Sequence, residues 1–126
     1  IEWYRKAAEQ DYAEAQYRLG ICYYEGTGIE QDYQKAVEWF RKAAEQDYAE
    51  AQNRLGEGYY YGEGVEENDW KAVWWYRKAA EQDYAPAQHN LGMCYQEGNG
   101  VEQDYQKAVE WYRKAAEQGH VRRKIT

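Results

Sequence analysis

The chain has 126 residues, of which 31% are charged, and its formal net charge is −7. This acidic balance argues against nucleic acid as a partner, because contact with phosphates requires a basic surface, and against electrostatic docking to an anionic membrane. A basic protein or peptide is the favoured partner, mainly through a higher association rate. No apolar run is long enough for a membrane helix, and no signal peptide is visible.

One pattern dominates the chain, which repeats itself every 36 residues without insertion or deletion. The phrases A-Q-x-x-L-G and G-x-G-(I/V)-E each recur three times at this period, and W-(Y/F)-R-K-A-A-E-Q begins at Trp3, Trp39, Trp75 and Trp111. A fixed period of this size is typical of stacked units that bury their apolar faces against one another. We therefore predict an all-α fold, an α-solenoid of 36-residue helix-turn-helix repeats with about seven helices, as a single repeat domain over residues 1–126.

The predicted elements follow the repeat in chain order. An N-terminal helix over residues 1–10 precedes three helix pairs, at about 13–46, 49–82 and 85–118. An irregular tail follows at 119–126, and it contains a basic cluster, Arg122, Arg123 and Lys124.

Each pair consists of a first and a second helix. In the first helix of the first pair, at about 13–25, helical spacing predicts one core stripe, formed by Ala15, Leu19, Cys22 and Tyr23. Gly26 is predicted to end this helix in a left-handed conformation, and Asp32 is predicted as the N-cap of the second helix. A glycine inside the first helix predicts close approach by a neighbouring helix, and it recurs as Gly20, Gly56 and Gly92.

The full pattern, A-x-A-Q-x-x-L-G-x-x-Y-x-x-G-x-G-(I/V)-x-x-D-Y-x-K-A-V-x-W-(F/Y)-x-K-A-A-E-Q, resembles the Sel-one-like repeat family, a relative of the tetratricopeptide repeat. The resemblance covers residues 1–119 and implies a right-handed superhelix whose first helices line the concave face. It also implies a role as an adaptor or scaffold. Some cysteine-rich bacterial members pair two cysteines within each helix pair, but this chain lacks the second cysteine of each such pair.

Positions that differ between otherwise matching units are candidate partner contacts. Three positions on each first helix lie roughly opposite the core stripe, and with their neighbours they give the predicted concave-face set: Tyr17, Arg18, Ile21, Tyr24, Asn53, Arg54, Glu57, Tyr60, His89, Met93 and Gln96. Exposed aromatic and apolar side chains beside arginine are typical of an interface centre, so the predicted anchors are Tyr17, Ile21, Tyr24, Tyr60 and Met93. The alternative is an ordinary solvated groove with a few stray apolar residues.

The second helix of the middle unit differs from its sisters at two positions. Trp70 and Trp74 replace a glutamine and a glutamate, and they are neighbours at i and i+4 on the helix surface. Two interpretations are open. Trp70 could fold over the slot that Tyr33 fills in the first unit, since Asp69 occupies that position here, or the two tryptophans could form a second contact surface.

The sequence offers little for catalysis or metal binding. It contains no serine, and its two histidines and two cysteines lack metal-site spacing. His89 and Cys94 lie about 140° apart around one helix, so their side chains diverge. Cys22 and Cys94 hold the same position two units apart, which is too far for a disulfide. We predict two buried free thiols, no disulfide, no metal and no cofactor; free thiols weakly favour a reducing compartment such as the cytoplasm.

From these observations we predict a non-catalytic scaffold or adaptor, not an enzyme, that binds a protein or peptide through its concave face. The alternative is a consensus-type or engineered structural array without a natural partner, because the units are so alike. In that case the uncapped ends, which a further unit would normally cover, could promote weak self-association of the monomer.

Overall fold

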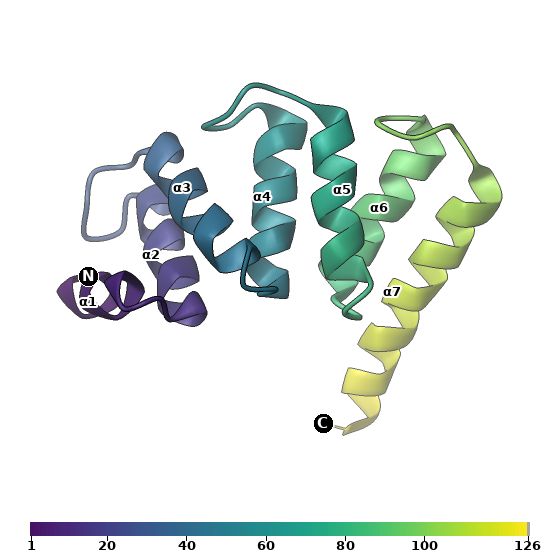
Figure 1. Ribbon diagram of the computed structural model, residues 1–126. Helices are drawn as coiled ribbons and strands as arrows, with labels where there is room; N and C mark the ends of the chain where they lie inside the picture. The colour runs from purple at the N-terminus through teal and green to yellow at the C-terminus, as the bar shows by residue number, and fades with distance from the viewer. Residues whose placement is uncertain (126) are drawn as a thin grey trace.

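The computed structural model describes the backbone of residues 1–125 and the side chains of residues 1–118. This part of the chain forms seven α-helices and no strand, which confirms the predicted all-α fold. The helices follow one another from one end of the array to the other, so α1 and α7 lie at opposite ends (Figure 1). They are α1 (Glu2–Glu9), α2 (Ala13–Glu25), α3 (Tyr33–Ala44), α4 (Ala49–Tyr61), α5 (Asp69–Ala80), α6 (Ala85–Glu97) and α7 (Tyr105–Ile125).

The helix boundaries follow from local residue chemistry. The first helices α2, α4 and α6 each end at a left-handed glycine, as predicted for Gly26, whose φ is 73°. A residue without a Cβ adopts this conformation without strain. The second helices begin at a side-chain cap, since Asp32 accepts from the backbone N–H of Lys35, and Asn68 accepts from that of Lys71, both at 3.1 Å. These caps satisfy N–H groups that the helix itself leaves unpaired.

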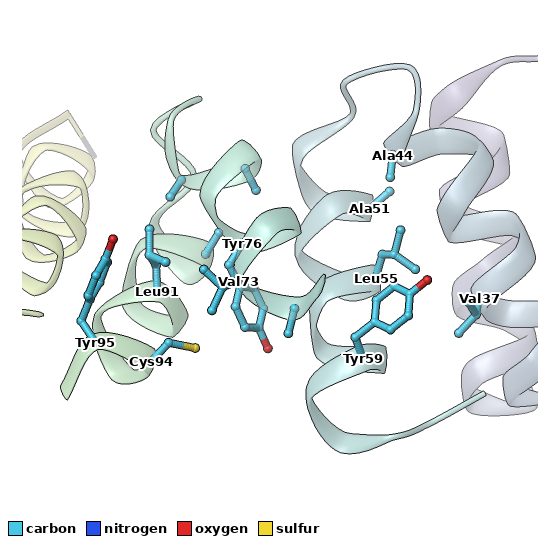
Figure 2. Packing of buried hydrophobic residues seen from close by; sticks show 14 of the residues in the cluster. Val37, Ala44, Ala51, Leu55, Tyr59, Val73, Tyr76, Leu91, Cys94 and Tyr95 are labelled. Carbon is cyan, nitrogen blue, oxygen red and sulfur yellow. The ribbon is translucent and has the colours of Figure 1, made fainter. Parts of the chain in front are cut away.

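A continuous apolar core runs along the array between the helices. The leucine of each first helix is fully buried, at 0% exposure for Leu19, Leu55 and Leu91. One cluster extends from Val37 on α3 to Ala108 on α7, and Figure 2 shows its part from Val37 to Tyr95. A second cluster joins α1, α2 and α3. Each unit therefore buries its apolar stripe against its neighbours, which is the packing that the 36-residue period predicts.

Glycines inside the first helices allow an aromatic ring of the following helix to press against the backbone. A Cβ on Gly20 would lie 2.6 Å from Phe40, and a Cβ on Gly92 would lie 2.9 Å from Tyr112. Both distances are shorter than van der Waals contact permits, so a residue with a side chain would force the two helices apart. The predicted close approach is confirmed.

A buried glutamine ties each unit to the turn that precedes it. Gln52 is 0% exposed, and its Nε2 donates to the Ala44 carbonyl and to Asp47 Oδ1, both at 3.2 Å. Its Oε1 accepts from Gln82 Nε2 at 2.9 Å. Asp47 has a φ of 64°, a left-handed conformation that aspartate tolerates better than most residues. The glutamine of the A-Q phrase therefore stabilises the turn, because its buried amide must be hydrogen-bonded.

The C-terminal end departs from the sequence prediction. We predict an irregular tail at 119–126, but α7 continues as a helix to Ile125, and Thr126 lies outside the described residues. Earlier units turn at this position with a positive φ, at Asp47 and Asp83. Gly119 takes that place in α7 and lies within the helix, so the aspartate that the buried glutamine would hold in the turn is missing.

The straight course of α7 leaves one buried acceptor unpaired. In the first unit, Gln16 Oε1 accepts from Gln46 Nε2 at 2.8 Å, in the turn that follows α3. In the third unit, Gln88 Oε1 has no hydrogen-bond partner among residues 1–118. Gln118 holds the repeat position of Gln46, but it lies within a continuous helix instead of a turn.

Candidate binding surface

The predicted contact residues all lie on α2, α4 and α6, and we call the surface that they form the first-helix face. Arg18, His89 and Gln96 are exposed, whereas Asn53 is buried, at 6% exposure. The remaining members of the face are half-buried: Tyr17, Ile21, Tyr24, Arg54, Glu57, Tyr60 and Met93. Sequence periodicity thus places these residues on the expected helices but does not determine which of them reach solvent.

Asn53 is buried, although its position in the repeat predicts that it is exposed. Its Oδ1 accepts from Asn90 Nδ2 at 2.9 Å, and the two residues belong to α4 and α6. The pair joins neighbouring first helices, and its hydrogen bond compensates the amide of Asn53 for the loss of water.

Two tyrosines reach from one unit to the loop of the next. Tyr24 OH donates to Glu63 Oε1 at 3.1 Å, and Tyr60 OH, at the same repeat position, accepts from Asn99 Nδ2 at 2.9 Å. The partners are 39 residues apart in both pairs. The guanidinium of Arg54 also lies over the ring of Tyr24, 5.6 Å from its centroid. These contacts fix neighbouring first helices relative to one another.

The predicted anchors of the first unit also contribute to the packing of the array. Tyr17 contacts the rings of Phe40 and Tyr48, with centroid distances of 5.9 and 5.4 Å. Tyr24 packs on Tyr33 at 5.0 Å, and Ile21 packs against the core cluster around α1 to α3. Replacing these side chains would remove packing as well as surface, so they are not neutral probes of binding.

Glu57 is the most constrained charge on the face. Burial raises its pKa above the usual value for glutamate, and Arg54, whose Nη1 lies 3.9 Å from Glu57 Oε1, offsets part of that rise. Burial and the hydrogen bond to Glu63 also raise the pKa of Tyr24. At neutral pH, therefore, the Tyr24 hydroxyl keeps its proton and donates a hydrogen bond to the half-buried carboxylate of Glu63.

Trp70 and Trp74 lie on α5, away from the first-helix face, and are 77% and 51% exposed. The interpretation in which Trp70 folds over a slot is wrong. The supposed slot is itself at the surface, because Tyr33 is 38% exposed and Tyr105 is 64% exposed. Both tyrosines stand at the first residue of a second helix. The second interpretation, a contact surface, stays a prediction.

The two cysteines are free and differ in their surroundings. Cys22 is half-buried and Cys94 is fully buried, so only the second matches the prediction of a buried thiol. Burial raises the pKa of Cys94 to about 12, which keeps this thiol protonated and unreactive at neutral pH. His89 packs instead against the ring of Tyr112, with a centroid distance of 5.2 Å.

The described part of the chain contains neither a cluster of metal ligands nor a membrane-spanning helix. Within it, no group of three or more potential ligand residues could hold a metal ion. None of its helices combines the length and the apolar character that crossing a membrane requires.

Comparison with known proteins decides the family. A family model described as the Sel1 repeat matches residues 1–12, 13–48, 49–84 and 85–120. The chain belongs to the Sel1 repeat family. The matched segments begin where α2, α4 and α6 begin, so each Sel1 unit is one first helix followed by one second helix. A search of curated proteins found no match.

Several solved bacterial structures are similar to this Sel1 chain. A protective antigen of uropathogenic Escherichia coli with an SLR fold is 48% identical, with a TM-score of 0.92 over 94% of this chain and 25% of that one. A Sel1 repeat protein from Oxalobacter formigenes is 44% identical, with a TM-score of 0.83 over 86% of this chain and 44% of that one. Cysteine-rich protein B of Helicobacter pylori is 27% identical, with a TM-score of 0.73 over 94% and 85% of the two chains. This chain therefore spans a quarter of the first protein and less than half of the second.

Sequence reasoning missed the loop residues that link adjacent Sel1 units. Glu63 and Asn99 each lie between the two glycines of a G-x-G phrase, where the first unit has Thr27. Each is bonded to a tyrosine of the preceding unit. The available signal was a polar residue that changes from unit to unit at a fixed place in an otherwise constant loop.

Proposed function

We propose that this Sel1 repeat chain is a non-catalytic scaffold that binds a protein or peptide across the first-helix face, which we place on the concave side of the solenoid. Sel1 repeat proteins are generally protein-interaction scaffolds, and both the family match and the solenoid fold support that role here. The proposal goes further by assigning binding to one face and to particular side chains.

The proposal rests on a contrast in how much core and surface positions vary between units. The core leucines Leu19, Leu55 and Leu91 are identical in the three units and are 0% exposed. Two residues after each leucine, the half-buried first-helix face changes in every unit: Ile21, Glu57 and Met93. Close packing restricts core positions to side chains of matching shape, whereas the face gives each unit its own chemistry. A surface that changes along the array is suited to recognising one partner along its length.

The exposed parts of the face favour a basic partner with apolar side chains. Tyr61 is 59% exposed and packs edge-on against Tyr60, with a centroid distance of 5.0 Å. Exposed carboxylates, Glu25 and Glu97, stand at the ends of α2 and α6. Aromatic rings supply contact area at low entropic cost, and the carboxylates would steer a cationic segment toward them.

The same side chains give little support for a catalytic role. The chain contains no serine, and the raised pKa of Cys94, about 12, disfavours a thiolate nucleophile. His89 has an aromatic ring as its nearest stacking partner. A general base needs a proton donor within hydrogen-bond reach, and this arrangement favours a contact role for His89.

The experiment uses a variant altered only at exposed positions. Arg18, Tyr61 and His89 belong to the three first helices and are all exposed, so their combined replacement by alanine should leave the melting temperature nearly unchanged. Affinity capture from a cell extract identifies a partner of the unaltered chain, and calorimetry then measures its affinity. We expect the variant to bind that partner at least about tenfold more weakly, or about 1.4 kcal/mol.

A matched control alters three exposed positions on the second helices, Gln34, Glu38 and Glu110, to alanine. It should retain the partner with unchanged affinity. Equal binding by all three proteins would contradict the assignment to the first-helix face. Loss of binding in the control alone would move the site to the second helices.

A further inference from the structure

A groove of about 800 Å³ lies between α5 and the start of α7, and we call it the α5–α7 groove. Its lining includes Trp70, Val73, Trp74 and Arg77 of α5, Tyr95 of α6 and Lys107 of α7. Residues 100–104, in the loop before α7, complete it. None of these residues belongs to the first-helix face, so a ligand here would bind independently of the partner proposed above.

Two tryptophans give the groove an aromatic wall. Trp70 is 77% exposed, so its ring and indole N–H are open to a ligand. Trp74 is 51% exposed; Lys78 Nζ lies 4.6 Å from its ring and Trp75 packs edge-on at 4.7 Å. These two contacts hold Trp74 in place while half of its surface remains available.

Two cations contact Tyr95, which lies on the floor of the groove. Arg77 Nη2 donates to Tyr95 OH at 2.6 Å, and Lys107 Nζ lies 5.6 Å from the centroid of the same ring. Within residues 1–118, neither cation forms an ion pair. The nearby carboxylate of Asp104 already accepts from the backbone N–H of Lys107 as a helix cap. Glu102 and Asp104 also line the groove, so the positive charges that a ligand carboxylate can pair with are confined to its Tyr95 side, where Arg77 and Lys107 lie.

The preceding unit shows which part of this arrangement is structural. There Arg41 donates to Tyr59 OH at 2.8 Å and Lys71 lies 5.4 Å from the Tyr59 ring, so the two cations over a tyrosine belong to the repeat. The tryptophans do not, because the same wall in that unit carries Gln34 and Glu38. The middle unit has thus exchanged a polar, acidic wall for an aromatic one above an unchanged cationic floor.

We propose that the α5–α7 groove binds an extended, proline-containing segment of another protein that also carries an acidic side chain. Trp70 and Trp74 would pack against prolines, and Arg77 and Lys107 would pair with the carboxylate. Segments in the polyproline II conformation dock in aromatic-lined grooves and lose little entropy on binding. The two tryptophans are one helical turn apart, about 6 Å between Cβ atoms, which matches two residues of polyproline II at about 3.1 Å each.

Charge also argues against a second copy of this chain as the occupant. A symmetric contact through the tryptophans would place each groove against the same surface of the other copy. Arg77 and Lys107 of the two copies would then approach one another, between chains that each carry a net charge of −7. An acidic segment of a different protein avoids the approach of like cations and pairs with Arg77 and Lys107 instead.

The test measures fluorescence anisotropy of a labelled, proline-rich synthetic peptide with one central glutamate, titrated with the full chain. The variant W70Q/W74E gives the middle unit the residues of the first unit at these positions, and both sites are exposed, so it should fold normally. We expect it to bind the peptide at least tenfold more weakly. A second peptide with lysine in place of glutamate should also bind more weakly to the unaltered chain.

A converse variant makes the test independent of any loss of folding. Q34W/E38W builds the same wall over Arg41, Tyr59 and Lys71, and it should raise the stoichiometry from one peptide per chain to two. Failure of the unaltered chain to bind the peptide, or equal binding by W70Q/W74E, would overturn the proposal. Concentration-dependent dimerisation that W70Q/W74E abolishes would overturn it too, by assigning the groove to a second copy.

Discussion

The ring of Tyr76 on α5 lies directly against the backbone of Gly56 on α4. A Cβ placed on Gly56 would be 2.7 Å from both Cδ1 and Cε1 of Tyr76, and 3.2 Å from the Ala72 carbonyl oxygen. Tyr76 is 1% exposed and is therefore unable to move aside without disturbing the core. This contact sets how closely the two helices of a Sel1 unit approach one another.

The first prediction concerns the two glycines of α4. Gly56→Ala should lower stability by about 1–3 kcal/mol, because the added methyl overpacks a filled site. Gly58 lies two residues further along, where a Cβ would meet Glu63 O at 3.4 Å and Val37 Cγ2 at 3.5 Å, both ordinary contacts. Gly58→Ala should therefore raise stability by up to about 1 kcal/mol through helix propensity. Chemical denaturation measures both, and similar effects from the two substitutions would contradict this account.

The second prediction concerns the buried glutamines. Gln82→Ala removes the donor to Gln52 Oε1 and should cost about 1 kcal/mol, because a buried acceptor loses its partner. Gln118→Ala is the matched control, since Gln118 has the same repeat position but Gln88 Oε1 has no partner to lose. It should change the free energy of unfolding by less than about 0.5 kcal/mol. Equal losses for the two variants would show that the hydrogen bond is not responsible.

The third prediction is a pH dependence from Glu57, whose pKa is raised by burial in the folded state. Above that raised pKa, the folded protein holds an ionised, partly buried carboxylate and is less stable for it. As the pH falls toward the ordinary pKa of glutamate, the folded state takes up a proton before the unfolded chain does, so this contribution to stability improves.

Glu57→Met tests this contribution, because the third unit has Met93 at the same position. The variant should be more stable than the unaltered chain at neutral pH, and the difference in melting temperature should shrink between pH 7 and pH 4. A difference that stays constant over this range would exclude Glu57 as its source.

The fourth prediction concerns thiol reactivity. Cys94 is 0% exposed and burial raises its pKa to about 12, whereas Cys22 is half-buried. A colorimetric disulfide reagent at pH 8 should therefore label the native protein rapidly at one site only, and Cys22→Ala should abolish that rapid phase. After unfolding, both cysteines should react. Two equal rapid phases in the native protein would show that the helices open more readily than their packing implies.

Much of the fold could be predicted from the sequence because a repeat supplies the same signal several times. The residues of α2 and the capping role of Asp32 agree with the predictions, since both depend on local chemistry within a few residues. The same local reasoning failed at α7, where the departure of the tail from the repeat suggested an irregular segment but the helix continues.

The candidate surfaces were harder to predict because exposure depends on neighbouring units. Asn53 holds a position that helical geometry places opposite the core, yet Asn90 of the next unit covers it. Trp70 could have been core or surface, and only its 77% exposure in the folded array places it at the surface. Helical periodicity describes one helix at a time and contains no information on which helices lie beside it.

The sequence by itself determined the period, the boundaries of helices such as α2 and the recurring core leucines, because these depend on residue type at fixed spacing. Only the tertiary structure decided the links between units, from Tyr24 to Glu63 and from Asn90 to Asn53. It also decided that Trp70 and Trp74 line a groove together with two cations and a tyrosine. The preceding unit has the equivalent cations and tyrosine but no tryptophan beside them. These contacts join residues from different units, and their formation depends on how the helices stack, which is set by packing across the whole array.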